Sequence, residues 1–151
     1  MLVKLNNANR ETAIEILRIQ IPAYKAEAAI IGFDGIPQLT DTVETIMDCP
    51  ETFIGYNLKE ELAGCISFTE TEQEIDICRL VVHPDHYRKG IARQLVNYIV
   101  TELSKDRSII VSTGALNTPA KNLYKNFGFI EVRDAEVGPG IFITLLEKKQ
   151  I

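Results

Sequence analysis

The segment HPDHYRKGIARQL, residues 83–95, places a proline turn, three basic residues and one glycine directly before an apolar helical pattern. A helix start exposes backbone N–H groups without intrahelical partners, and these groups attract anions. Gly90 leaves room for an anion to approach the main chain, and Ala92 keeps the next inward position small. Three side chains can offset the remaining charge: Arg88, Lys89 and Arg93. The segment predicts a local anion site, with a solvated helix cap as the alternative.

Backbone amides should dominate such a site, since hydrogen bonds to a charged group contribute about 1.5–3 kcal/mol each. The helix dipole adds only roughly 0.3–1 kcal/mol. The sequence contains neither GxxxxGK[ST] nor GxGxxG, so it supports neither a P-loop nor a dinucleotide-binding turn.

The chain as a whole is acidic, with a net charge of -5 over 151 residues and a pI of about 5.1. This balance disfavours general binding to nucleic acid or to an anionic membrane. Hydrophobic residues make up 46% and charged residues 25%, which are globular values. We expect one domain, residues 1–151, that folds without disulfides or metal.

Three cysteines, Cys49, Cys65 and Cys78, form no CxxC pair and have no histidine at ligand spacing. This pattern argues against a zinc site and a disulfide framework, and favours free thiols in a reducing compartment. No stretch of about 18 apolar residues occurs. We therefore expect a cytoplasmic protein with no membrane partner.

The first third of the chain predicts a strand at residues 1–5 and a helix at about residues 8–20 that Pro22 ends. Residues 23–39 are expected to form a broken helix or a loop. Thr40 or Asp41 would cap a second helix that reaches Met47. Period-two runs at residues 52–57, 63–70 and 74–83 predict an antiparallel meander.

The second half predicts a helix with its apolar stripe between Ala92 and Leu103, and then a strand at residues 108–113. A further helix would have Thr118 as N-cap and Pro119 as first residue, with Gly128 just past its end. Two strands at residues 129–136 and 140–148 close the chain. This order indicates an α/β (α+β) domain with a mixed sheet and helices on its faces.

Two segments carry a resemblance to a known family. RLVVHPDHYRKGIARQLV resembles the signature of the GNAT superfamily of acyl-CoA-dependent N-acetyltransferases, a strand and an HP-type turn followed by [QR]xxGx[GA]. Gly90 and Ala92 match the last two positions, and Tyr87 stands where Gln or Arg is usual. NTPAKNLYKNFGF, residues 117–129, is similar to the later signature NxxAxxLYxxxGF. The resemblance implies a mostly antiparallel central sheet with one splayed strand pair that holds acetyl-CoA.

The resemblance also implies which residues bind acetyl-CoA. The pyrophosphate would lie on Arg88, Lys89, Gly90, Ile91, Ala92 and Arg93. The backbone of Leu80, Val81 and Val82 would bind the pantetheine arm, because that strand diverges from residues 109–113 in the family. A backbone N–H near Val82 would polarise the thioester carbonyl. Asn117 is expected to contact the pantetheine or to cap a helix.

Tyr124 matches the family tyrosine that gives a proton to the coenzyme A sulfur. Its reference pKa of about 10 keeps it protonated at neutral pH. A packed aromatic is the alternative. For the proton acceptor, Asp76 falls four residues before Leu80, where some family members carry a carboxylate. In a regular strand, Glu74 and Asp76 would share a face with Leu80 and Val82. A solvated strand face, attraction of a cationic substrate, or a water chain are the alternatives.

The implied function is transfer of the acetyl group of acetyl-CoA to a primary amine by direct attack in a ternary complex. No cysteine lies in the family motifs, and His83 and His86 are expected to be structural or solvent-facing. In the family, the region of residues 24–47 shapes the acceptor site, here with Tyr24, Phe33, Ile36 and Ile46. Four acids would suit a small cationic amine if they face the cleft: Asp34, Asp41, Glu44 and Glu51.

Alternatives are a peptide or protein N-acetyltransferase and a catalytically inactive CoA-binding sensor module. A homodimer is possible.

Overall fold

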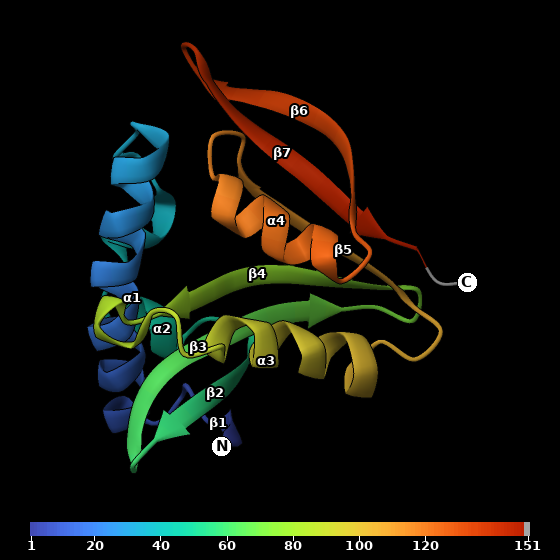
Figure 1. The fold of residues 1–151 in the computed structure, drawn as a ribbon. Coiled ribbons are helices and arrows are strands. Elements are labelled where there is room, and N and C mark those ends of the chain that lie inside the picture. Colours follow the sequence, from blue (N-terminus) through green and yellow to red (C-terminus); the bar gives the residue numbers. More distant parts are fainter. Residues whose placement is uncertain (150–151) are drawn as a thin grey trace.

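The computed structural model describes residues 1–149 and, within them, one seven-stranded sheet in the order β1-β2-β3-β4-β5-β7-β6 (Figure 1). Every neighbouring pair is antiparallel except the parallel pair of β4 and β5. The predicted mixed, mostly antiparallel sheet and its meander are confirmed. The strands are β1 (Leu2–Leu5), β2 (Thr52–Leu58), β3 (Glu61–Glu70), β4 (Glu74–Val82), β5 (Ser108–Gly114), β6 (Ile130–Gly138) and β7 (Ile141–Lys148).

Helices cover both faces of this sheet and create two apolar cores. One core joins α1 and α2 to one face, and the other joins α3 and α4 to the opposite face. The helices are α1 (Arg10–Ile31), α2 (Val43–Met47), α3 (Ile91–Tyr98) with its π-helical continuation η3 (Ile99–Leu103), and α4 (Thr118–Asn126). Short 3₁₀ turns are η1 (Pro37–Thr40) and η2 (Pro84–His86). None of the helices in residues 1–149 combines the length and apolarity needed to cross a lipid bilayer.

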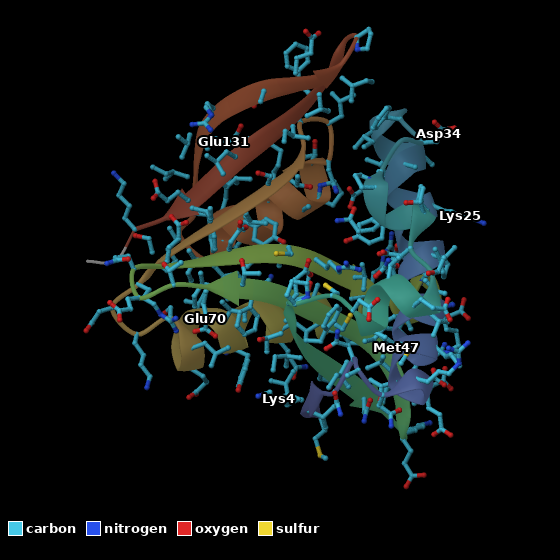
Figure 2. The ribbon with its side chains drawn as sticks, turned by 180° about the vertical axis from the view of Figure 1, so that it is seen from behind. Lys4, Lys25, Asp34, Met47, Glu70 and Glu131 are labelled. Carbon is cyan, nitrogen blue, oxygen red and sulfur yellow. The ribbon has the colours of Figure 1, made fainter. Side chains whose placement is uncertain are left out.

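Helix α1 is the largest departure from the sequence prediction, because it continues through Pro22 to Ile31 and ends at Gly32 in the left-handed conformation. An internal proline costs roughly 3 kcal/mol. The buried stripe continues beyond it with Ala23, Tyr24 and Ile31, so packing against the sheet compensates. The predicted break after Gln20 is therefore wrong. Figure 2 shows the outward face of this helix, where Lys25 points into solvent.

Two predicted N-caps are displaced by one or two residues. Thr42, rather than Thr40 or Asp41, caps α2 in a reciprocal box with Thr45. Asn117, rather than Thr118, caps α4, and its side-chain oxygen accepts a hydrogen bond from the Ala120 N–H at 3.2 Å. In both cases a neighbouring polar residue has the geometry that lets its side chain reach back to the helix start.

The parallel strands β4 and β5 separate part of the way along their length. Glu74–Ile77 pair with Ser108–Val111, and the pairing stops there. Beyond this point β4 stays paired with β3, and β5 stays paired with β7. The two halves of the sheet diverge toward α1, as Figure 1 shows. The predicted splayed pair is present.

A β-bulge at Cys78 changes which face each side chain of β4 presents. Ile77 pairs with Phe68 and Arg79 with Ser67, so Cys78 is the extra residue. Before the bulge, Ile75 and Ile77 pack in the α3/α4 core, whereas after it Val81 packs in the α1/α2 core. Glu74 and Asp76 therefore do not share a face with Leu80 and Val82, and that prediction is wrong because the strand is not regular.

Arg79 fixes the elements that surround the bulge. Its side chain is 7% exposed, and it donates to Asp41 at 2.8 Å, to Glu51 at 3.1 Å and to Gln20 of α1 at 2.8 Å. A guanidinium supplies donors in a rigid fork, so one side chain can bind three partners. The cluster holds α1 and the chain on both sides of α2 against β4.

Candidate functional site

Two connected cavities occupy the opening between the diverging strands. The inner cavity, of about 390 Å³, lies between α1, β4, β5, α4 and β7. The loop cavity, of about 650 Å³, lies between α1, the end of β4, the loop before α3, and α4. Four residues line both: Tyr24, Glu27, Leu80 and Ala120. The cavities therefore form one cleft, and Glu27 lies where they join.

The loop cavity is bounded by the turn that the sequence marked as an anion site. Arg88 has φ 65° and Gly90 has φ 76°, both in the left-handed region. Among the described residues no side chain caps the start of α3 at Gly90, and no atom beyond Gly90 and its chain neighbours lies within 4 Å of where its Cβ would be. The first N–H groups of α3 are therefore open toward the cavity. This backbone can cradle an anion.

Five of the six predicted loop residues line this cavity: Arg88, Gly90, Ile91, Ala92 and Arg93. Lys89 is not among the lining residues, and its Nζ lies 3.1 Å from Nδ1 of His86. The main chain and the two arginines, rather than the lysine, face the cavity. Phosphate recognition by Lys89 stays a prediction.

The end of β4 offers free backbone groups to the cleft. The N–H of His83 donates to the Ala63 carbonyl of β3 at 2.9 Å. Because hydrogen bonding alternates along an antiparallel ladder, Val81 also faces β3, whereas Leu80 and Val82 face the gap left by β5. Leu80 and Val82 are thus suited to bind an extended amide chain, and Val81 contributes to the wall through its side chain.

Helix α4 contributes Asn117 and Tyr124. Asn117 is buried, lines the loop cavity, caps the helix, and donates to Oγ1 of Thr113 at 3.3 Å. Tyr124 lines the inner cavity, is 3% exposed, and its ring lies 5.4 Å from that of Phe129. Burial, followed by the charge of Glu27, raises the pKa of Tyr124, so its hydroxyl keeps its proton at neutral pH and can act as a donor.

The two predicted acids of β4 lie elsewhere. Within residues 1–149, neither Glu74 nor Asp76 lines the inner or the loop cavity. Asp76 is exposed and belongs to the part of β4 that still pairs with β5. Partial burial and the charges of Glu74 and Glu51 raise the pKa of Asp76. A base role for Asp76 or Glu74 stays a prediction, but the strand geometry that favoured it is absent.

Sequence reasoning missed Glu27. Its spacing from Tyr24 and Ile31 is a helical signal, three and four residues apart on one face. Pro22 hides this signal, because a proline at that position predicts the end of the helix. Of the carboxylates in residues 1–149, Glu27 is the one that lines these cavities. Burial raises the pKa of the Glu27 carboxyl.

The acids proposed to attract a cationic substrate do not face the cleft. Asp41 and Glu51 bind Arg79, and Glu44 binds Arg10 at 2.9 Å. Asp34 lies beyond the end of α1 at the surface (Figure 2). The condition under which these four residues would favour a small cationic amine is therefore not met, and the identity of the substrate stays a prediction. Tyr24, Phe33 and Ile36 do line the inner cavity, whereas Ile46 is buried in the α1/α2 core.

Cys78, His83 and His86 offer little catalytic chemistry to the cleft. Cys78 lines the inner cavity, but burial followed by the charges of Glu51 and Asp76 raises its pKa to about 11. It is therefore a thiol at neutral pH, whereas a nucleophile needs a thiolate. Nδ1 of His83 accepts a hydrogen bond from the Asp85 N–H at 3.1 Å, which stabilises the turn. His86 borders the loop cavity beside Lys89.

Comparisons with known proteins show which family has these features. The model of the acetyltransferase (GNAT) family matches residues 15–129, which include the cleft residues from Tyr24 to Tyr124. "UPF0157 protein YqkA" of Bacillus subtilis is 40% identical over 145 residues, or 96% of this chain. The chain spans 42% of the length of that relative.

Solved structures share the fold at low sequence identity. The structure of smu.2055 from Streptococcus mutans has a TM-score of 0.80 at 13% identity, covering 99% of this chain and 98% of that one. The paia N-acetyltransferase from Thermoplasma acidophilum, solved in complex with coenzyme A, has a TM-score of 0.72 at 18% identity, covering 99% and 98%. Nearly the whole described chain thus has the architecture of these two proteins.

Proposed function

Because the chain belongs to the GNAT acetyltransferase family, we propose that it transfers the acetyl group of acetyl-CoA to a primary amine. The divergence of β4 from β5 beside an open helix start carries the proposal. An extended amide chain fits the free backbone of Leu80 and Val82, and a pyrophosphate fits the amides after Gly90. Bound coenzyme A in a protein of the same fold supports this choice of donor.

The main chain would position the donor. Backbone groups of β4 would bind the pantetheine amides, and a β4 N–H near Val82 would polarise the thioester carbonyl. Arg88 and Arg93 line the loop cavity, where they would offset the phosphate charge. This arrangement would direct the thioester from the loop cavity toward the inner cavity, where Tyr124 lies.

Tyr124 would supply the proton that the departing sulfur needs. The hydroxyl stays protonated because burial raises its pKa, and Tyr124 lines the cavity that would contain the thioester. Direct transfer from donor to amine is favoured because Cys78, the cysteine that lines the cavity, has a raised pKa. The reaction would proceed in the cytoplasm, since three unpaired thiols fit a reducing compartment.

The test combines binding and turnover. Calorimetry with acetyl-CoA should show binding, and release of free thiol should require an added amine. A panel should include alkyl amines, polyamines, aminoglycosides and peptides with free N-termini. Tight acetyl-CoA binding with no turnover for any amine would favour the sensor module, and turnover confined to peptides would favour the peptide acetyltransferase. The possible homodimer stays a prediction, tested by the mass of the protein in solution.

A further inference from the structure

We propose that Glu27 binds the ammonium group of the acceptor and takes its proton, and that the acceptor carries this single charge on an apolar body. This inference rests on the proposed acetyl transfer and names the group and the substrate class that complete it.

The position of Glu27 is the first argument. It lies on α1 three residues after Tyr24 and lines both cavities at their junction. A thioester that enters through the loop cavity must reach this junction before it meets Tyr124. A carboxylate at the junction is therefore adjacent to the place where an amine would attack.

The second argument is that Glu27 has no partner in the described chain. Within residues 1–149 its side chain forms no hydrogen bond and no salt bridge, although it is half-buried. By contrast, Asp41 and Glu51 both bind Arg79. An acceptor that fills the cleft would cover this half-buried carboxylate, and losing water there is costly unless a cation or donor compensates it, so the site favours a cationic ligand.

The third argument is the field that Glu27 exerts. Burial is the main cause of the raised pKa of Tyr87 and of Tyr124, and the charge of Glu27 is the second cause. The charge of Glu27 also raises the pKa of Tyr24, again after burial. These tyrosines come from three separate parts of the chain and converge on the cleft. The Glu27 carboxylate therefore faces the same space as the proposed acid, Tyr124.

The composition of the inner cavity limits the acceptor. Six apolar residues form much of its wall: Ile31, Phe33, Ile36, Ile141, Phe142 and Ile143. Arg79 also lines it, but two carboxylates bind its guanidinium. A second ammonium group would be desolvated against this wall with no free carboxylate beside it. The cavity of about 390 Å³ suits an arylalkyl or alkyl monoamine better than a polyamine or aminoglycoside.

The proton and electron balance closes without another reactant. Glu27 takes one proton from the ammonium group and passes it to water. The nitrogen lone pair then forms a bond to the thioester carbon, and the carbon–sulfur bond breaks with its electron pair on sulfur. Tyr124 gives that sulfur a proton, and the second proton lost by nitrogen restores Tyr124. The products are the acetamide, coenzyme A thiol and one proton in solution.

Other titratable groups around Glu27 would shape a pH profile. They are Tyr24, Tyr87 and Tyr124, Cys78 and Arg79 of β4, and His86 of the loop cavity. Arg88 and Arg93 lie toward the loop end. The tyrosines and Cys78 have raised pKa values and stay protonated near neutrality. Glu27 and His86 are therefore the groups to separate, and His86→Asn serves that purpose.

The experiment compares Glu27→Gln and Glu27→Asp with the matched control Glu11→Gln, which removes a carboxylate from an exposed position of α1. With 2-phenylethylamine as acceptor, Glu27→Gln should lower kcat/KM by about 100-fold, the scale of general-base catalysis. Glu27→Asp should recover part of the activity, and Glu11→Gln should match the wild type. Glu27→Gln should also lose the acidic limb of the kcat/KM profile, whereas His86→Asn should keep it.

A binding measurement separates this inference from the proposed function. With coenzyme A bound, calorimetry should show that 2-phenylethylamine binds the wild type and that Glu27→Gln weakens it at least about 10-fold. Spermidine should be the poorer ligand and the poorer substrate. Normal turnover in Glu27→Gln would overturn the role of Glu27 while leaving acetyl transfer intact. Loss of turnover in Asp76→Asn alone would assign the base to β4. No amine binding or turnover in the wild type would overturn both proposals.

Discussion

The two ends of the cleft recognise charge in different ways. At the loop end, backbone amides after Gly90 and two arginines, Arg88 and Arg93, line the loop cavity. At the inner end, Glu27 and Tyr124 stand in an apolar wall built from α1, α4 and β7. The loop end depends mainly on a backbone conformation, which Gly90 adopts at φ 76°. The inner end depends on individual side chains, because few neighbouring residues in the cavity could take over their chemical roles.

The largest expected effect breaks the loop end. Gly90→Glu should weaken acetyl-CoA binding about 1,000-fold, because it adds strain at φ 76° and a negative charge that opposes two or more charge-assisted hydrogen bonds. Calorimetry measures the Kd of acetyl-CoA for each variant. Gly140→Glu is the matched control, since Gly140 has φ 75° and open space in the β6–β7 turn. Equal losses in both variants would indicate general misfolding, and retained affinity in Gly90→Glu would place the pyrophosphate elsewhere.

At the inner end, Tyr124→Phe should lower kcat about 100-fold and leave the Kd of acetyl-CoA unchanged, since the ring still packs on Phe129. Because burial raises the pKa of Tyr124, the wild type should show no loss of activity from its ionisation up to pH 10. Steady-state rates between pH 6 and pH 10 measure both effects. If Tyr124→Phe had the same rate as the wild type across this range, Tyr124 would not be the acid.

A smaller effect distinguishes direct transfer from an acetyl-enzyme. Cys78→Ser should lower kcat/KM by at most about fivefold, because the thiol contributes packing to the cavity wall and a hydrogen bond to the Asp76 carbonyl, which a serine hydroxyl can also donate. If Cys78 carried the acetyl group, the loss would approach that of a missing nucleophile. Intact-protein mass after incubation with acetyl-CoA alone provides a second readout, in which a stable gain of one acetyl group on Cys78 would contradict direct transfer.

The smallest expected effect concerns stability at the inner end. The folded-state pKa of Glu27 is raised, so the folded state holds more protons than the unfolded state and stability falls as pH rises through that pKa. Glu27→Gln removes the charged form and should raise the Tm at pH 8 by about 1–4 °C. The gain should vanish at pH 4, where Glu27 is protonated. A lower Tm at pH 8 would mean that Glu27 has a structural partner.

The same contrast explains what could be predicted from the sequence. The loop end follows from one continuous segment, so Gly90, Ala92 and the arginines were identified from their spacing and resemblance. The sheet and its splayed strands followed from the order of period-two runs and the family resemblance. The inner end is assembled from distant segments, and its geometry depends on whether α1 passes Pro22 and where β4 bulges. Both outcomes are decided by tertiary packing, which local propensity does not contain.

The bulge at Cys78 has a consequence for how such a chain can change during divergence. Substitutions on either side of it alter one wall position at a time. Loss of Cys78 itself would join Ile77, which pairs with Phe68, directly to Arg79, which pairs with Ser67, so both halves of β4 would keep their faces. If Cys78 instead paired as an ordinary strand residue, the second half of β4 would shift by one position, and Arg79 would leave its carboxylates for the face of the apolar α3/α4 core. The bulge can therefore absorb a change of one residue in length, so related chains should be aligned by the paired residues on either side of it.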